Sequence, residues 1–267
     1  MTENDLKPGR IVAVVNQKGG VGKTTTTINL STSIALGGFK VLAVDMDPQG
    51  NLSSGVGQKG GRAKGGTVYE ALLKDDDPAS FLLQTGFDNL SLMPSDRSLT
   101  GAEIELVSFP ERERRLKKVL DPLRALFDFI FIDCPPSLGL LTLNSLVAAD
   151  AVLIPLHCEY FALEGLAELI GTIRRLRGSL NPALDIDGVL LTMYDDRTNL
   201  GQLVARDVRD YFKEKVFNTI IPRNVRLGEA PSHGLPCVVY DPKSRGSVAY
   251  NALAKEVLTR RRALTAS

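Results

Sequence analysis

The chain has 267 residues, 43% of them hydrophobic, and a formal net charge of +1. This length and composition suit one α/β domain with a sizeable core, and the small net charge argues against a uniformly basic nucleic-acid binder. The cysteines Cys134, Cys158 and Cys237 lie far apart without a C-x-x-C spacing, which argues against a disulfide framework and a zinc site.

Short apolar runs rich in β-branched residues alternate with segments of helical period. In chain order, we expect a strand at 11–16, a helix at 24–36, strands at 41–45, 90–94 and 129–133, a helix at 140–148, a strand at 151–156, a helix at 163–176, a strand at 188–192 and a helix at 203–212. Repeated strand-then-helix order predicts a doubly wound, mostly parallel sheet flanked by helices, with ligands beyond the carboxyl ends of the strands.

The termini and one glycine-rich segment interrupt this pattern. We expect residues 1–9 to form a flexible tail, residues 10–267 to form a single domain, and residues 55–66 to form a flexible surface loop. From residue 247 the sequence predicts a helix with an apolar face of Val248, Leu253 and Val257 and a basic final turn, for which the helix macrodipole is a sufficient reason.

The N-terminus is polar, and no apolar run approaches the roughly 18 residues that cross a bilayer, so neither a signal peptide nor a membrane span is predicted and we expect a cytoplasmic protein. Charge is unevenly distributed: residues 1–170 hold 16 Lys/Arg against 21 Asp/Glu, and residues 171–267 hold 16 against 10. Charged residues on solvated helix faces explain this asymmetry as well as a binding site does. The asymmetry still makes the last third of the chain the place to look for a site that binds a polyanion.

The sequence GVGKTT at residues 20–25 follows an expected buried strand and opens an expected helix, the context of a phosphate-binding loop. Gly20 and Gly22 let backbone N–H groups face the phosphates, Lys23 reaches the β and γ oxygens, and the Thr24 hydroxyl binds Mg²⁺. The general pattern G-x-x-x-x-G-K-[ST] places glycine where this chain has Gln17.

A second lysine, Lys18, follows that departure. One interpretation is that Lys18 is an ordinary exposed lysine with no role in the site. The alternative is that Lys18 points away from its own nucleotide and neutralises charge on a nucleotide held by a second subunit, a role worth about 10³ to 10⁵ in rate. Hydrolysis would then require a dimer.

Three carboxylates stand at or just after the ends of apolar strands: Asp45, Asp47 and Asp133. We expect them to converge near the phosphates, with Asp133 holding Mg²⁺ through water, Asp45 assisting, and Asp47 orienting the attacking water. Helix capping is the competing interpretation for each strand-terminal Asp taken singly.

The motifs resemble those of one ATPase family. KGGVGKT at 18–24 resembles the deviant Walker A motif, DMDPQGN at 45–51 its partner switch, and FIDCPPS at 131–137 its Walker B strand. The segments 220–236 and 240–246 are similar to the C-terminal signature of ParA/Soj-type chromosome and plasmid partitioning ATPases, and the resemblance runs from about residue 11 to 258.

This resemblance implies an ATPase that uses ATP and Mg²⁺, is slow unless stimulated, and forms a homodimer on binding ATP, with Lys18 acting across the interface. It further implies non-specific binding of double-stranded DNA, a nucleoid-associated location, and a ParB/Spo0J-type centromere-binding partner. The expected nucleotide-binding residues are Lys18, Gly19, Gly20, Val21, Gly22, Lys23, Thr24, Thr25, Pro222 and Asn224. The DNA-contacting arginines correspond to Arg197, Arg223 and Arg226; pairing of Arg197 with Asp195 or Asp196 is the alternative.

Two other functions are compatible with parts of the sequence. A MinD-like ATPase that binds membrane through its C-terminal helix needs bulky apolar anchors, and after Val257 this chain offers only Leu258 and Leu264. A nucleotide-gated scaffold that positions a protein cargo is a further alternative. His157 and His233 are expected to lie away from the motifs, and Cys134 is expected to be a small core residue.

Overall fold

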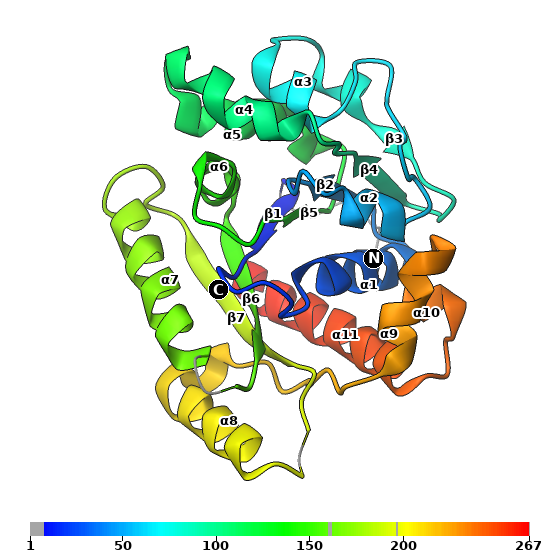
Figure 1. The fold of residues 1–267 in the computed structure, drawn as a ribbon, viewed down its shortest axis with the longest axis vertical. Coiled ribbons are helices and arrows are strands. Elements are labelled where there is room, and N and C mark those ends of the chain that lie inside the picture. The colour runs from blue at the N-terminus through cyan, green and yellow to red at the C-terminus, as the bar shows by residue number, and fades with distance from the viewer. Residues whose placement is uncertain (1–7, 160–161, 196, 267) are drawn as a thin grey trace.

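The computed structural model describes residues 8–159, 162–195 and 197–266 (Figure 1). Within these residues the strands form one seven-stranded sheet in the order β3-β4-β2-β5-β1-β6-β7. The strands are β1 (Arg10–Val14), β2 (Val41–Asp45), β3 (Leu83–Gln84), β4 (Leu90–Met93), β5 (Phe129–Asp133), β6 (Ala151–His157) and β7 (Asp185–Thr192). All neighbouring pairs are parallel except β3 with β4. The doubly wound, mostly parallel sheet is therefore confirmed.

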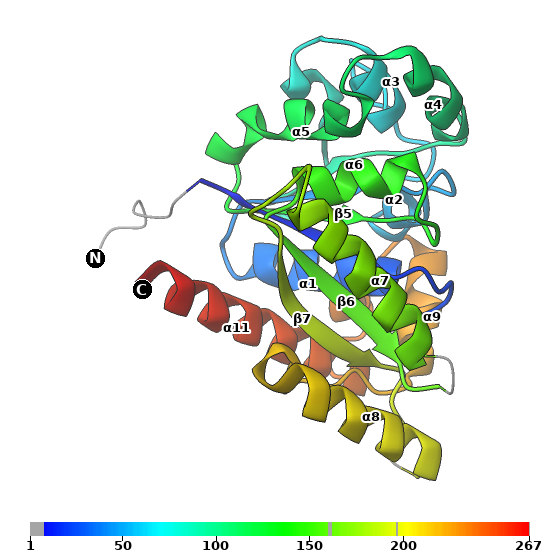
Figure 2. The same cartoon turned by 90° about the vertical axis from the view of Figure 1, so that its left-hand side faces the viewer.

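Helices cover both faces of this sheet (Figures 1 and 2). The α-helices are α1 (Lys23–Leu36), α2 (Asn51–Gly55), α3 (Val68–Leu73), α4 (Leu99–Glu105), α5 (Arg115–Leu120), α6 (Leu140–Ala148), α7 (Ala162–Arg177), α8 (Asn199–Phe212), α9 (Val225–Glu229), α10 (Cys237–Tyr240) and α11 (Arg245–Ala266). Short 3₁₀ helices cover Pro78–Phe81, Leu106–Ser108, Arg112–Arg114, Pro122–Ala125, Lys213–Lys215 and Ala230–His233.

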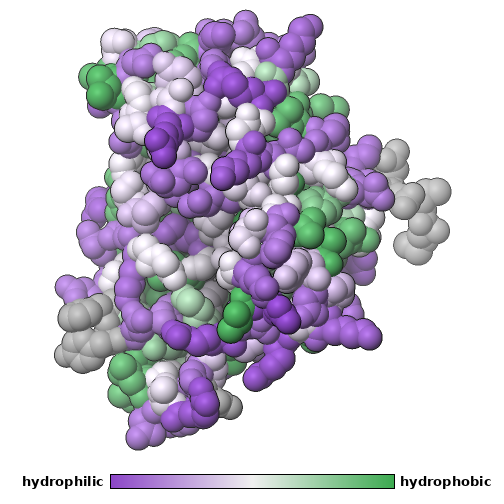
Figure 3. Space-filling view, turned by 45° about the vertical axis from the view of Figure 1, so that its right-hand side comes forward, coloured by the Kyte–Doolittle hydropathy of each residue, from purple (hydrophilic) through white to green (hydrophobic). Residues whose placement is uncertain are grey.

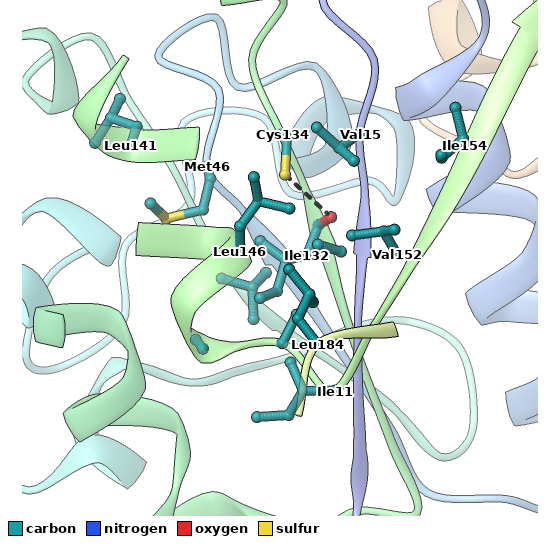
Figure 4. Packing of buried hydrophobic residues seen from close by; sticks show 14 of the residues in the cluster. Ile11, Val15, Met46, Ile132, Cys134, Leu141, Leu146, Val152, Ile154 and Leu184 are labelled. Atoms are coloured by element: carbon teal, nitrogen blue, oxygen red, sulfur yellow. Dashed lines mark hydrogen bonds between the residues drawn. The ribbon is translucent and has the colours of Figure 1, made fainter. Parts of the chain in front are cut away.

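Alternate residues of each strand face opposite sides of the sheet and build two cores. In β1, Ile11 and Ala13 pack with α3 to α8, whereas Val12 and Val14 pack with α1, α2 and α9 to α11. Figure 4 shows part of the first core, in which Cys134 is 1% exposed and its thiol donates to the Ile132 carbonyl oxygen. The expected core position of Cys134 is thus confirmed.

The sequence located the apolar runs well and missed elements that depend on capping. The strands expected at 41–45 and 129–133 and the helix expected at 140–148 have the predicted bounds. Helix α3 was missed, although Thr67 and Glu70 form a capping box at its start. Helix α8 begins four residues before the predicted start because the Thr198 side chain caps it.

The glycine-rich segment 55–66 begins with the last residue of α2 and contains one isolated bridge, between Ala63 and Gly66. Its Arg62 forms ion pairs with Glu70 and Asp96. One of its three basic side chains is therefore already neutralised by the protein itself.

The C-terminal helix is confirmed, but two details of the prediction are wrong. Val248 is 57% exposed and does not belong to the buried face, which contains Tyr250, Leu253 and Val257. The basic residues Arg260, Arg261 and Arg262 precede the last turn of the helix, so the helix macrodipole does not explain their position.

Contacts with the body of the domain explain those arginines instead. The guanidinium of Arg260 lies 4.2 Å from the ring centroid of Phe217 and donates to the Val216 carbonyl oxygen. Arg261 is buried, with its guanidinium 4.3 Å from the ring centroid of Phe129. Cations over aromatic faces are stabilised when they are partly desolvated, so these two side chains fasten the end of α11 to the domain.

At the other end of the chain, the Gly9 amide donates to the Arg124 carbonyl oxygen; residues 1–7 of the expected tail lie outside the described residues. No helix in the described part of the chain combines the length and apolarity needed to cross a membrane. Figure 3 shows a face on which hydrophilic side chains predominate and hydrophobic ones form small scattered groups.

Candidate functional site

The loop between β1 and α1 lies at the carboxyl edge of the sheet and is shaped by two glycines. Gly20 has φ of 72° and Gly22 has φ of 88°, the left-handed region that costs other residues about 1 kcal/mol or more. Gly22 caps α1 without any side-chain hydrogen bond. The first amide groups of α1 are thus left for another acceptor, and a phosphate suits this position.

Lys23 is the charged group at the base of this loop. It is 7% exposed, and its Nζ donates to the Lys18 carbonyl oxygen at 3.0 Å. Burial lowers its pKa, while the nearby Asp133 opposes that change. A bound phosphate would stabilise the ammonium form that burial disfavours.

A cavity of about 750 Å³ opens beside the loop. Eight of the ten expected nucleotide-binding residues line it: Gly19, Gly20, Gly22, Lys23, Thr24, Thr25, Pro222 and Asn224. The other two, Lys18 and Val21, do not. Val21 is buried, and its carbonyl oxygen accepts from the Thr192 hydroxyl at 2.8 Å, so it supports the loop through its backbone.

Asp133 is fully buried behind the loop and lies opposite Asp45 in the register of β2 and β5. The Thr27 hydroxyl donates to its Oδ1 at 3.2 Å, and its Oδ2 is buried without a hydrogen-bond partner among the described residues. Burial, then the neighbouring Asp45, raises the pKa of Asp133. An unpaired buried acceptor near Lys23 and Thr24 fits a hydrated Mg²⁺, which keeps several waters when it binds with substrate phosphates.

Asp45 is also fully buried, but its oxygens already have partners. Its Oδ2 accepts from the Ser53 amide at 2.8 Å and the Ser53 hydroxyl at 2.7 Å, and its Oδ1 accepts from the Asp47 amide at 3.2 Å. Asp45 therefore holds the start of α2 and the turn before it, as the capping interpretation expects. A contact of Asp45 with the metal stays a prediction.

Removing the Asp45 carboxylate separates these two roles. Asp45→Ala is expected to lower the free energy of unfolding by about 2–3 kcal/mol, because it leaves buried donors of Ser53 and Asp47 without an acceptor. Urea denaturation measures this loss. The exposed cap variant Asp77→Ala, which removes one bond to the Ala79 amide, should cost only about 1 kcal/mol. Unchanged stability with a lost Mg²⁺ dependence of nucleotide binding would instead favour the metal role.

Asp47 lies in the turn after β2 and lines the cavity. Its Oδ1 accepts from the Gln49 amide at 2.9 Å. Burial is the main cause of the raised pKa of Asp45 and of Asp133, and the charge of Asp47 adds to both. The three carboxylates therefore lie close enough to interact electrostatically, which agrees with the expectation that they converge. Asp47 alone of the three is both partly exposed and open to the cavity.

Lys18 points away from the cavity. Its Nζ forms an ion pair with Glu159, and the side chains of both are about half-exposed, at 40% and 46%. His157 Nδ1 lies 2.9 Å from the same carboxylate. The expectation that His157 lies away from the motifs is therefore wrong: β6 ends beside the loop, a neighbourhood that sequence spacing does not reveal. His233, the last residue of the 3₁₀ helix Ala230–His233, stacks on Tyr240.

Comparison with known proteins identifies the family. A model described as an AAA domain matches residues 9–186. The sporulation initiation inhibitor protein Soj of Bacillus subtilis is 53% identical over 249 residues, which are 93% of this chain and 98% of that protein. The chain belongs to the ParA/Soj family.

Other relatives agree with this membership. A chromosome partitioning protein ParA of Myxococcus xanthus is 54% identical over 94% of this chain and 89% of its own length. The crystal structure of cobyrinic acid a,c-diamide synthase from Mycobacterium smegmatis with bound ADP and magnesium has a TM-score of 0.82 and 38% identity over 95% of this chain and 96% of its own. The cell division ATPase MinD of Pyrococcus furiosus has a TM-score of 0.78 and 29% identity over 94% of this chain and 99% of its own.

This ParA/Soj chain is an ATPase that uses ATP and Mg²⁺. In its described part, no three His, Cys, Asp or Glu side chains group to hold a metal ion by themselves. In ATPases Mg²⁺ is usually held by one or two carboxylates together with nucleotide phosphates and several waters.

The expected DNA-contacting arginines of the ParA/Soj chain lie in two groups. Arg197 and Arg223 line a second cavity of about 470 Å³, and Arg223 also borders the nucleotide cavity. Arg197 pairs with Asp195, with Nη2 and Oδ2 2.7 Å apart, so the pairing alternative holds in this structure. Arg226, in α9, forms ion pairs with Glu229 at 2.6 Å and with Asp241 at 3.4 Å. Exposed pairs of this kind are worth little, so they can be exchanged for phosphate contacts.

Two supporting residues were missed from the sequence. Asn16 is buried after β1; its side chain accepts from the Lys18 amide at 3.0 Å and donates to the Pro155 carbonyl oxygen at 2.8 Å. Thr192, at the end of β7, donates a hydrogen bond from its hydroxyl to the Val21 carbonyl oxygen. Both are polar residues at the end of an apolar run, which is the signal that could have identified them.

Proposed function

We propose that this ParA/Soj chain is a nucleotide-gated partitioning ATPase. ATP binding forms a homodimer, the dimer binds double-stranded DNA without sequence preference, and a ParB/Spo0J-type centromere-binding partner stimulates slow hydrolysis and releases the dimer. Chromosome or plasmid segregation is the process served, in the cytoplasm and on the nucleoid. The names of the relatives in Bacillus subtilis and Myxococcus xanthus support this assignment.

The divergence of the two loop lysines supports the proposal most. Lys23 is buried at the base of the nucleotide cavity, whereas the half-exposed Lys18 lies outside it. A charge outside its own cavity is suited to a nucleotide bound by another subunit. Lys18 would thereby make dimer formation depend on nucleotide and hydrolysis depend on the dimer.

Each group has a distinct chemical role in this proposal. The loop amides and Lys23 bind the phosphates, and Asp47 orients the attacking water. Thr24 and, through water, Asp133 would hold Mg²⁺, which would supply positive charge to the phosphates. The partner's Lys18 neutralises the charge that develops as the terminal phosphate leaves.

The DNA surface proposed here combines Arg197, Arg223 and Arg226. All three belong to the net-positive last third of the chain. Arg223 borders the nucleotide cavity, and Arg226 is the second residue of α9, whose Val225 and Leu227 line that cavity. Arginine contacts with phosphates give salt-dependent affinity with little base preference.

Charge reversal at α9 tests this surface. Arg226→Glu is expected to weaken binding to random-sequence DNA at least tenfold and to lower the salt slope by about 1, because a phosphate contact becomes a repulsion. Electrophoretic shifts across a salt series measure both. Lys74→Glu makes the same charge change after α3, on the opposite side of the sheet, and should bind DNA like wild type. Equal loss in both variants would misplace the DNA surface.

The proposal as a whole is tested by DNA binding with ATP, ADP or no nucleotide, with anionic vesicles as a parallel arm. Binding that requires ATP, ignores sequence and weakens with salt is expected. ATP-dependent vesicle binding without DNA binding would favour the MinD-like function. Leu253 and Val257 of α11 pack against the domain and are therefore not available to lipid, which favours DNA binding over membrane binding.

A further inference from the structure

Helix α1, which begins at the phosphate-binding lysine, is joined to α11 by two side-chain hydrogen bonds, of which only the first lies between two buried residues. The hydroxyls of Thr26 and Tyr250 lie 3.1 Å apart. Two turns farther along α1, the Ser33 hydroxyl donates to Asn251 Oδ1 at 2.9 Å. The same pair of helices therefore carries one bond beside the nucleotide site and one remote from it.

Tyr250 is the member of this set that reaches the site. Its side chain is 1% exposed, and it lines the nucleotide cavity together with Thr25. Burial raises its pKa, so the phenol stays protonated at neutral pH and keeps a proton to donate. The phenol is thus fixed at the wall of the cavity by packing and by one hydrogen bond.

Its partner belongs to the first turn of α1. Thr26 is fully buried, and its amide donates to the Gly22 carbonyl oxygen at 2.9 Å. It is followed by Thr27, whose hydroxyl bonds both Asp133 and the Lys23 carbonyl oxygen. Rotation of this turn would move Lys23 and Asp133 relative to each other.

We propose that Tyr250 is a positioning residue for ATP hydrolysis and that it acts through its hydroxyl. By holding Thr26, it sets the rotation of the first turn of α1 and so the places of Lys23 and Thr24 against the terminal phosphates. It touches α1 and does not take part in the chemical step. Loss of this hydroxyl leaves ATP binding through the loop amides and removes the alignment that the transition state needs.

Steady-state ATP hydrolysis by the full chain, in the presence of DNA, tests the role. Tyr250→Phe keeps the ring and removes the hydroxyl; kcat should fall about fivefold, the equivalent of one buried hydrogen bond, while KM for ATP changes by about twofold at most. Thr26→Val removes the other partner at nearly constant volume. The double variant should be no slower than the slower single variant, because both changes remove one bond.

Ser33→Ala is the matched control. It removes a hydrogen bond between the same two helices, remote from the loop, so it should lower the melting temperature without lowering kcat. A kcat of Tyr250→Phe equal to wild type would overturn the proposal. An equal fall in kcat for Tyr250→Phe and Ser33→Ala would also overturn it, because general helix packing would then explain both.

Discussion

Lys18→Ala is expected to bind Mg·ATP with near wild-type affinity and to lose ATP-dependent dimerisation and about 10³-fold in hydrolysis rate. The reason is geometric: Lys18 lies outside the nucleotide cavity of its own chain and pairs with Glu159. Light scattering with ATP and a phosphate-release assay measure the two losses.

Lys23→Ala should differ from Lys18→Ala in nucleotide binding, because Lys23 is buried and lines the nucleotide cavity. It is expected to abolish nucleotide binding, and with it every later step. Lys59→Ala changes an exposed lysine of the glycine-rich segment and serves as the control, which should match wild type in nucleotide binding, dimerisation and hydrolysis. Equal loss of nucleotide binding in the Lys18 and Lys23 variants would contradict the role of Lys18 in trans.

The second large effect is expected at Asp47. Asp47→Ala should still form the ATP dimer but hydrolyse ATP about 10² to 10⁴ times more slowly, because the group that orients the attacking water is gone. The dimer should therefore persist on DNA after free ATP is removed. Retention on immobilised duplex DNA, followed over time, measures this persistence.

Asp47→Asn separates chemistry from turn structure. The amide oxygen can still accept the bond from the Gln49 amide, so the turn after β2 is kept while the carboxylate is lost. We expect hydrolysis as slow as that of the alanine variant. Turnover of either variant at the wild-type rate would assign the orientation of water to another group.

The sequence predicted the elements that local pattern determines. The continuous apolar runs of β2 and β5 read as buried strands because both of their faces are covered, and their bounds were correct. Strand β7 began three residues earlier than expected because Asp185, Ile186 and Asp187 lie at the half-buried start of the strand, where no apolar run marks it.

In the site, the glycines and Lys23 were predictable because a helix start after a buried strand has a known relation to phosphate. The partner of Lys18 was not, because Glu159 lies 141 residues away and meets it only once β6 is placed beside β1. The hydrogen bonds that Asp45 accepts from the Ser53 hydroxyl and amide were likewise not predictable from the sequence, so its structural role could not be distinguished there from a contact with the metal. Contacts of this kind follow from sheet order, and residue spacing does not encode them.

The packing of α1 against α11 has a consequence for how the protein is made. Residues near the start of the chain, including Ile28 and Ile34, share one core with Leu253 and Val257 near its end. Ribosomes release a chain from its N-terminus, so this face of α1 lacks its packing partner until almost all of the chain has been synthesised. The nucleotide loop is translated long before Tyr250, which forms part of the wall of its cavity. A nascent chain should therefore acquire full nucleotide affinity only after α11 has been synthesised.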